Sequence, residues 1–219
     1  MNNIFKPLNK DAEIHRRRRY LPHWKQSGCT YFVTFRTADS LPQSKLKEMN
    51  EQKKIWMSYH PEPWSEQDWD EYNRRFTEKI QTWLDAGYGA CVLQQPELSA
   101  IVASALRYFD HDRYVLDEFV VMPNHAHALL MPQGKHVVER ILHTWKSYTA
   151  NKINAHLGVS GMFWMNENFD HAVRSWDQLE RFRRYIRENP AKAGLREGSF
   201  LLGAGKTGIA HNVTRPSRP

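Results

Sequence analysis

The stretch that decides the fold is residues 113–131, which read RYVLDEFVVMPNHAHALLM. Residues 113–122 and 125–131 are rich in β-branched and other apolar side chains, a composition typical of strands. Pro123 and Asn124 lie between the two segments and favour a turn. We therefore predict an antiparallel β-hairpin whose second strand begins at His125.

The second strand of this hairpin carries two histidines, His125 and His127. Successive side chains of a strand point to opposite faces, so residues i and i+2 share one face. Both imidazoles therefore emerge together, close enough to bind one metal ion. Ala126 points to the opposite face, where helices should cover it. The pattern also fits two surface histidines, because a chain with 11 histidines contains such pairs by chance.

Hydrophobic periodicity predicts the remaining elements outward from the hairpin. Residues 29–37 favour a further strand, and residues 170–174 a fourth. Helices are predicted for residues 43–57, 65–86, 98–109, 137–157 and 177–189, the last of them stopped by Pro190. This order predicts an α+β fold, a ferredoxin-like antiparallel sheet with helices on one face plus a C-terminal helix.

The composition indicates one globular domain over residues 1–202 and a flexible basic tail over residues 203–219. Lys and Arg number 31 against 24 Asp and Glu, which gives a net charge of +7. This surplus favours a polyanionic partner such as nucleic acid, although a basic surface also serves solubility. We expect Cys29 and Cys91 to be reduced core residues of a cytoplasmic protein. No apolar run approaches the roughly 18 residues that span a bilayer.

Two basic segments are candidates for contact with phosphates. The first is a polar N-terminal arm, either solvated or bound to phosphate, that contains Arg16, Arg17, Arg18 and Arg19. The second is the helix predicted at 177–189, where Tyr185 and Asn189 share a face at i and i+4. Taken alone, these two are more simply explained as a core-edge aromatic and a helix cap. The same helix and the residues after it, however, are densely basic, with Arg181, Arg183, Arg184, Arg187 and Lys192.

Four segments together carry a family resemblance: VVMPNHAHALL at 120–130, WKSYT at 145–149, DHAVR at 170–174 and YIRENPAKAGL at 185–195. In this order they resemble the REP-associated tyrosine transposases. Those proteins are relatives of the IS200/IS605 single-tyrosine transposases within the HUH nucleases. The resemblance covers roughly residues 16–37 and 96–196. Residues 40–95 depart from the compact form of the family and look like a helical insertion, to which the sequence assigns no role.

The resemblance implies a metal-dependent transposase that cuts and rejoins single-stranded DNA. It implies that His125, His127 and Asn189 bind Mg²⁺ or Mn²⁺ and that Tyr185 is the nucleophile, which forms a 5′-phosphotyrosine. Related insertion-sequence enzymes have the longer Gln where this chain has Asn189. The implied substrate is a palindromic repeat that folds as a DNA hairpin, and the implied location is the bacterial nucleoid. The implied state is a monomer, although relatives form dimers that exchange the tyrosine helix.

Several residues and functions have alternatives at this stage. Tyr148 is a rival nucleophile, but its helix is expected on the other face of the sheet. His171 is either a structural residue or a support beside the metal or the tyrosine. Lys146 and Arg140 are candidate DNA contacts. The chain as a whole is alternatively a non-catalytic protein that binds a DNA or RNA hairpin, or a structural regulator whose basic tail contacts nucleic acid.

Overall fold

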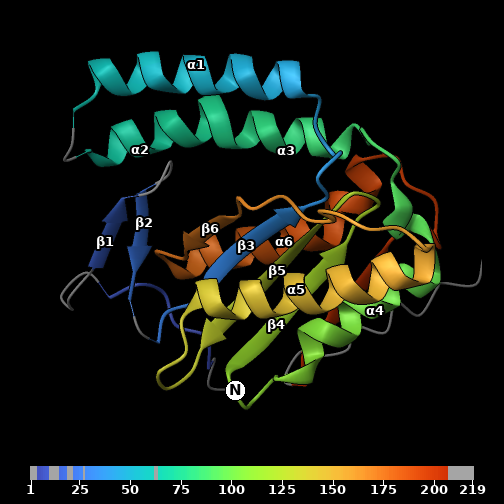
Figure 1. Cartoon of the computed structure of the whole chain (residues 1–219). Helices are drawn as coiled ribbons and strands as arrows, with labels where there is room; N and C mark the ends of the chain where they lie inside the picture. Colours follow the sequence, from blue (N-terminus) through green and yellow to red (C-terminus); the bar gives the residue numbers. More distant parts are fainter. Residues whose placement is uncertain (1–3, 10–14, 19–21, 27, 62–63, 207–219) are drawn as a thin grey trace, which may run out of the picture.

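The centre of the molecule is a five-stranded antiparallel sheet with the strand order β6-β3-β5-β4-β7 (Figure 1). The computed structural model describes residues 4–9, 15–18, 22–26, 28–61 and 64–206. The strands of this sheet are β3 (Tyr31–Arg36), β4 (Tyr114–Val121), β5 (His125–Pro132), β6 (Phe169–Ala172) and β7 (Leu201–Ala204).

The predicted hairpin is confirmed as β4 and β5, which pair antiparallel with a register shift between Leu116 and Phe119. Its turn is closed by a hydrogen bond from the Met122 amide to the His125 carbonyl, at 2.8 Å. On its other side β5 pairs with β3, and Thr34 lies directly opposite His127. The segment that carries both histidines is therefore the central strand of the sheet.

Helices cover both faces of the sheet, and the apolar residues of β5 divide between them. Helices α4 (Pro96–Tyr108) and α5 (Val138–Leu157) pack on one face, against a core that includes Ala126 and Ala128. Helix α6 (Trp176–Lys192) packs on the opposite face, where Leu129 contacts Leu179 and Ile186 in a second core. Figure 1 shows α5 in front of the sheet and α6 behind it. The predicted α+β architecture with a separate C-terminal helix is confirmed.

The end of α6 differs from the prediction, because the helix continues through Pro190 to Lys192 instead of stopping before the proline. Pro190 removes one backbone donor, but the turn around it is held by Ala193, whose amide donates to the Asn189 carbonyl at 2.9 Å. The chain leaves the helix at Gly194, whose φ of +66° favours glycine. Asn189 is therefore inside the helix, and its side chain is not needed as a cap.

Strand β7 was not predicted, and it corrects the proposed start of the tail at residue 203. It adds to the free edge of β4, with Gly203 opposite Phe119. A Cβ on Gly203 would lie 2.4 Å from the Phe119 ring, so this strand can approach only because a glycine stands there. Apolar periodicity is weak in four residues, which is why the sequence did not reveal the strand. Residues 207–219 of the predicted tail lie outside the described residues.

The predicted N-terminal arm contains a two-stranded antiparallel hairpin, β1 (His15–Arg18) and β2 (Pro22–Lys25). The backbone of Arg16, Arg17 and Arg18 therefore lies in a strand, and Arg19 lies outside the described residues. Cys29 and Cys91 are free thiols, and Cys29 is buried, as expected, whereas Cys91 is only partly buried and is not a core residue. Among the described residues, no helix combines the length and apolar character that crossing a membrane requires.

The insertion at about 40–95 forms a helical hairpin beyond the edge of the sheet, with α1 lying over α2 and α3 (Figure 1). Helix α1 spans Gln43–Tyr59 and α2 spans Glu66–Tyr72. A π-helical turn at Asn73–Thr77 joins α2 to α3 (Glu78–Asp85), so the helices predicted at 43–57 and 65–86 are both confirmed. The hairpin has its own core, made of Met49, Trp56, Tyr72 and Phe76.

Candidate active site

The two histidines lie side by side beneath α6, as their spacing predicted. Both His125 and His127 are fully buried, and their Nε2 atoms are 3.0 Å apart. The rings are steeply inclined, at 76°, with centroids separated by 4.7 Å. Burial lowers the pKa of His125 to about 3, and burial with the neighbouring imidazole lowers the pKa of His127 well below its usual range. Both side chains are therefore neutral near pH 7, which is the form that binds metals.

Asn124 orients the first histidine, a role beyond the turn position expected from the sequence. Its Nδ2 donates to the carbonyls of Leu84 at 3.3 Å and Tyr88 at 2.9 Å. Because a carbonyl only accepts, these contacts direct the Asn124 Oδ1 to His125 Nδ1, 2.7 Å away. His125 Nδ1 must then carry the proton, and His125 Nε2 presents a lone pair to the site.

Thr34 is the corresponding partner of the second histidine. Its Oγ1 lies 2.8 Å from His127 Nδ1, across the β3–β5 pairing. A hydroxyl can donate or accept, so Thr34 accommodates either tautomer of His127. Without a cation, His127 Nε2 donates the proton shared with His125 Nε2. If a cation were bound at His127 Nε2, the His127 proton would lie on Nδ1 and be donated to Thr34.

Helix α6 brings Tyr185 and Asn189 to the histidines within the same chain. The Tyr185 ring lies 5.2 Å from the His127 ring, centroid to centroid. Asn189 is fully buried, and its Nδ2 donates to Asp85 Oδ1 at 3.2 Å. The Asn189 Oδ1 atom is buried without a hydrogen-bond partner. An unpartnered buried oxygen is unusual, and here it belongs to a side chain that the resemblance implies as a metal ligand.

Two side chains of the insertion also reach the site, and sequence reasoning missed both. Tyr185 donates its hydroxyl hydrogen to Gln81 Oε1 at 3.3 Å, and Gln81 Nε2 donates to Thr34 Oγ1 at 3.4 Å. Asp85 Oδ1 lies 3.7 Å from His125 Nε2. These residues sit on α3, about a hundred positions before α6, and no local pattern marks them. Only the docking of α3 on the sheet edge reveals them.

The tyrosine hydroxyl is held in its neutral form. Burial raises the pKa of Tyr185, the negative charge of Asp85 raises it further, and a hydrogen bond with Asn189 acts in the opposite direction. Burial likewise raises the pKa of Asp85, opposed by Asn189 and Lys192. In the free protein, the Tyr185 hydroxyl therefore stays protonated beside the Asp85 carboxylate. Added positive charge nearby would favour ionisation of this hydroxyl.

The donor set fits a divalent cation if an amide oxygen is counted. Within the described part of the chain, no three His, Cys, Asp or Glu side chains are arranged to hold a metal. The histidine pair therefore needs a donor of another kind, and the unpartnered Asn189 Oδ1 supplies one. Two imidazole nitrogens and an amide oxygen suit Mn²⁺ or Mg²⁺ and leave positions for phosphate oxygen and water.

The rival nucleophile and the supporting histidine lie elsewhere. Tyr148 is half exposed on α5, across the sheet from the histidines. His171 contacts Gln178, whose Nε2 is 3.1 Å from His171 Nε2, and its ring packs on Phe182. The structure thus brings Tyr185, and not Tyr148, to the histidine pair. It gives His171 a partner on α6 instead of a contact with that pair.

The basic side chains predicted to bind DNA on α6 are all exposed, but they point in different directions. Arg181 precedes Tyr185 by one helical turn and shares its flank, and Lys192 follows on the same side. Arg187 lies on the other flank, where it pairs with Glu118 at 3.2 Å. Arg184 falls between these directions. Arg181 and Lys192 are therefore the two predicted contacts best placed beside the tyrosine.

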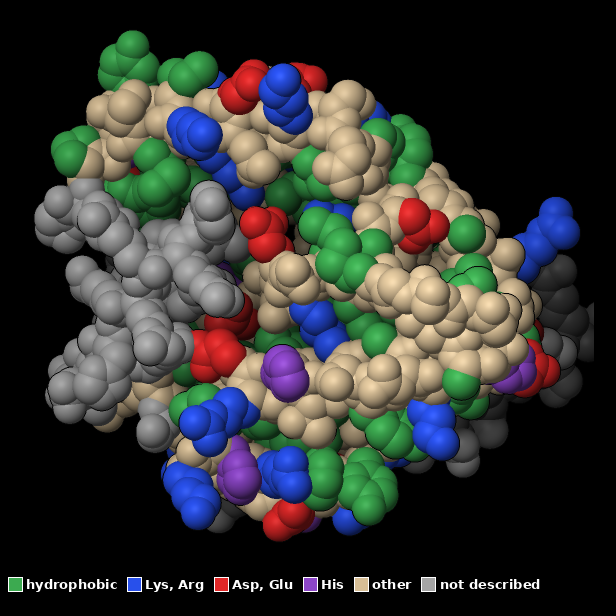
Figure 2. Space-filling view, in the orientation of Figure 1, with side chains coloured by type: hydrophobic (Ala, Val, Ile, Leu, Met, Phe, Trp, Pro, Cys, Tyr) green, Lys and Arg blue, Asp and Glu red, His purple; other side chains and the backbone are tan. Residues whose placement is uncertain are grey.

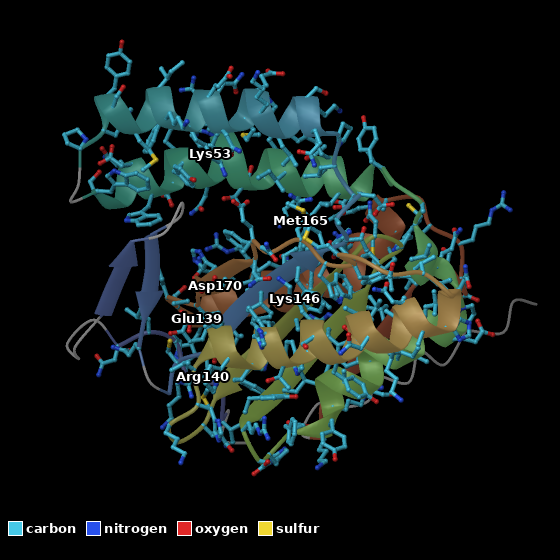
Figure 3. The ribbon with its side chains drawn as sticks, in the orientation of Figure 1. Lys53, Glu139, Arg140, Lys146, Met165 and Asp170 are labelled. Atoms are coloured by element: carbon cyan, nitrogen blue, oxygen red, sulfur yellow. The ribbon has the colours of Figure 1, made fainter. Side chains whose placement is uncertain are left out.

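Lys146, a candidate DNA contact, has an internal role. Its Nζ donates to the carbonyls of Met165 and Asn166 and to Asn168 Oδ1, and so holds the segment before β6. Figure 3 shows Lys146 on α5 directed toward Met165, whereas Arg140 lies in the first turn of α5. On the face in Figure 2, Lys and Arg are scattered among acidic residues and form no single patch. This face, which α5 covers, gives no support to a DNA surface.

Comparison with known proteins adds one family and one solved structure. Residues 87–189 match the family model described as "Transposase IS200 like". This segment contains both histidines, Tyr185 and Asn189, and the resemblance deduced from the sequence is confirmed over it. No curated protein matches the chain. The chain is similar to a solved structure described as "Structure of the REP associates tyrosine transposase bound to a REP hairpin", at 17% identity and a TM-score of 0.42, over 84% of this chain and 76% of that one.

Proposed function

We propose that this chain, which matches the IS200-like transposase family over residues 87–189, cuts and rejoins single-stranded DNA through a covalent bond to Tyr185. The observation that carries the proposal is the convergence of three features in one chain. Tyr185 stacks edge-on against His127, the histidine pair presents neutral nitrogens, and Asn189 offers an unpartnered oxygen. Binding of DNA alone would not require this combination.

The proposed first step is an attack by the Tyr185 hydroxyl oxygen on a backbone phosphorus. The new bond joins that oxygen to phosphorus, and the bond to the 3′ oxygen breaks. The products are a 5′-phosphotyrosine and a free 3′-OH, and overall the tyrosine proton moves to the leaving oxygen. Because phosphodiester energy is kept in the covalent link, a second 3′-OH can reverse the step and join a new strand.

His125, His127 and Asn189 are the residues that would hold the divalent cation, Mg²⁺ or Mn²⁺. When bound, such an ion polarises the scissile phosphate and stabilises the charge that develops on it. Asn124 and Thr34 serve this step indirectly, since their hydrogen bonds leave His125 Nε2 and His127 Nε2 facing the same point. Because burial raises the pKa of Tyr185, positive charge near its hydroxyl would favour the ionised form that reacts.

Access to the nucleophile involves the insertion. Gln81 accepts the hydrogen of the Tyr185 hydroxyl, so an incoming phosphate must displace that contact. Arg181 and Lys192, on the tyrosine flank of α6, are proposed to hold neighbouring phosphates. The proposed substrate is a single-stranded DNA that folds as a palindromic hairpin, as the sequence resemblance implies. The proposed active unit is a monomer, as the sequence resemblance implies.

The test is a denaturing gel of labelled hairpin DNA incubated with the protein, with Mn²⁺ or with a chelator. We expect a covalent protein–DNA adduct that requires Mn²⁺, persists in Tyr148→Phe and is lost in Tyr185→Phe. An adduct that survives in Tyr185→Phe but disappears in Tyr148→Phe would refute the assignment of the nucleophile. DNA that is retarded on a native gel but uncut under every metal condition would instead indicate a binding protein.

A further inference from the structure

The insertion contributes a carboxylate at the centre of the proposed metal site. Asp85 is the last residue of α3, and its Oδ1 lies 3.7 Å from His125 Nε2 and 3.2 Å from Asn189 Nδ2. Asp85 lies outside the matched transposase segment, which begins at residue 87. Its side chain is 23% exposed, so it lies at the rim between the buried histidines and solvent.

The hydrogen bonds around this carboxylate leave one buried acceptor without a donor. Asn124 places the His125 proton on Nδ1, so His125 Nε2 has a lone pair, which in the free protein accepts from His127 Nε2. Asp85 Oδ1 accepts from Asn189 Nδ2, and Asn189 Oδ1 has no hydrogen-bond partner. A cation bound by these residues would give Asn189 Oδ1 a partner and replace the proton shared by the two histidines.

The separations support the same conclusion. Two ligands about 2.1 Å from an octahedral Mg²⁺, and at right angles, lie about 3.0 Å apart. The Nε2 atoms of His125 and His127 already have this separation, 3.0 Å. The 3.7 Å between Asp85 Oδ1 and His125 Nε2 exceeds it by less than an ångström, so the partly exposed carboxylate of the free protein would have to move that far toward the histidines to become a ligand.

Charge gives an independent reason for a carboxylate at this place. Two imidazoles and one amide are neutral, so they compensate none of the charge of a divalent ion. Mg²⁺ and Mn²⁺ prefer oxygen ligands, and protein Mg²⁺ sites usually include one or two carboxylates. Asp85 supplies a carboxylate within ion-pair distance of the histidine pair.

We propose that Asp85 is a fourth protein ligand of the divalent cation, and that the insertion at 40–95 serves to deliver it. This inference rests on the proposed function, since it assumes the cation held by His125, His127 and Asn189. The insertion would thereby support the metal ligands in two ways, through the Asp85 carboxylate and through the backbone carbonyls that orient Asn124, in addition to its contact with Tyr185 through Gln81. The alternative is that Asp85 only orients the Asn189 amide.

The decisive comparison is Mn²⁺ binding to the full-length protein without DNA, measured by the loss of the free Mn²⁺ signal in electron paramagnetic resonance. Asp85→Asn removes the charge but keeps an oxygen that accepts from Asn189, so it separates the two roles. Glu78→Gln, an exposed change on the same helix, is the matched control. We expect Asp85→Asn to weaken Mn²⁺ binding by about tenfold or more, and Glu78→Gln to leave it unchanged.

A smaller loss in a folded Asp85→Asn protein overturns the assignment, provided that His125→Ala still abolishes binding. If His125→Ala binds Mn²⁺ as tightly as the wild type, the histidine site itself fails, and the proposed function fails with it. A second measurement avoids mutation altogether. In wild-type protein labelled with ¹³C-aspartate, Mn²⁺ bound to Asp85 should show a ¹³C hyperfine coupling, and its absence would also overturn the proposal.

Discussion

Replacing Asn124 with alanine is expected to impair both the stability of the protein and its affinity for metal. The buried Asn124 side chain makes three hydrogen bonds, two donated to the carbonyls of Leu84 and Tyr88 and one accepted from His125 Nδ1. At about 1 kcal/mol each, their loss lowers the free energy of unfolding by roughly 3 kcal/mol. Leu84 and Tyr88 lie on either side of the last residue of α3. Losing the hydrogen bonds to their carbonyls therefore loosens the contact between the insertion and the hairpin turn.

The second effect of Asn124→Ala concerns the tautomer of His125. Without an acceptor at Nδ1, the proton can move to His125 Nε2, which is the atom that should face the cation. Loss of a residue that supports a metal ligand typically weakens binding by about tenfold to a hundredfold. We therefore expect Mn²⁺ affinity to fall within that range, although Asn124 itself does not contact the cation.

The assays are urea denaturation followed by circular dichroism and calorimetric titration with Mn²⁺. Asn154→Ala is the control, because Asn154 makes one exposed hydrogen bond, to the Gly161 carbonyl, at the far end of α5. That variant should lose less than about 1 kcal/mol of stability and no Mn²⁺ affinity. A folded Asn124→Ala protein that binds Mn²⁺ as tightly as the wild type would refute the role assigned to Asn124 in orienting His125.

Three further outcomes are expected. Gln81→Ala should accelerate adduct formation at limiting DNA, because the substrate no longer has to displace Gln81 from Tyr185. The expected gain is about threefold to tenfold, the equivalent of one neutral hydrogen bond. A slower rate would mean that Gln81 positions the Tyr185 hydroxyl. Arg183→Met should destabilise the protein by roughly 3 kcal/mol in urea, because it leaves the buried Asp117 carboxylate without the guanidinium 2.7 Å away; an unchanged midpoint would contradict this. The pKa of His171 is lowered to about 4, chiefly by desolvation, so in metal-free protein its protonation favours the unfolded state, and stability should fall as pH drops from about 6.5 towards 4. His171→Asn should reduce that slope by about 1.4 kcal/mol per pH unit, and an unaltered slope would argue against a neutral His171 in the folded protein.

The sheet and the half of the site on β5 were predictable because they depend on local patterns. Alternation in residues 113–131 gave both the hairpin and the shared face of His125 and His127, and the structure confirms them. The i, i+4 spacing likewise placed Tyr185 and Asn189 on one flank of a helix. The prediction that Pro190 ends this helix was wrong, since a proline near the last turn removes one donor without preventing the turn around it.

The other half of the site could not be predicted because it depends on docking between distant segments. Gln81 and Asp85 contact residues about a hundred positions later, and a polar helix offers no periodic signal for such a contact. Asn124 looked like a turn residue, and its orientation becomes evident only when the carbonyls of Leu84 and Tyr88 are in place. Family resemblance did not help either, since the insertion lies outside the matched segment apart from its last residues.

We propose that one chain contains the whole active site, and in the structure Tyr185 lies beside the His127 of the same chain. The most direct test mixes two inactive proteins, Tyr185→Phe and His127→Ala, before hairpin DNA and Mn²⁺ are added. Every chain in the mixture lacks either Tyr185 or His127, so no chain has a complete site of its own, and we expect the mixture to form no covalent adduct. Recovery of adduct in the mixture, to a substantial fraction of the wild-type yield, would show that the tyrosine helix acts on the histidines of another chain and would contradict the claim.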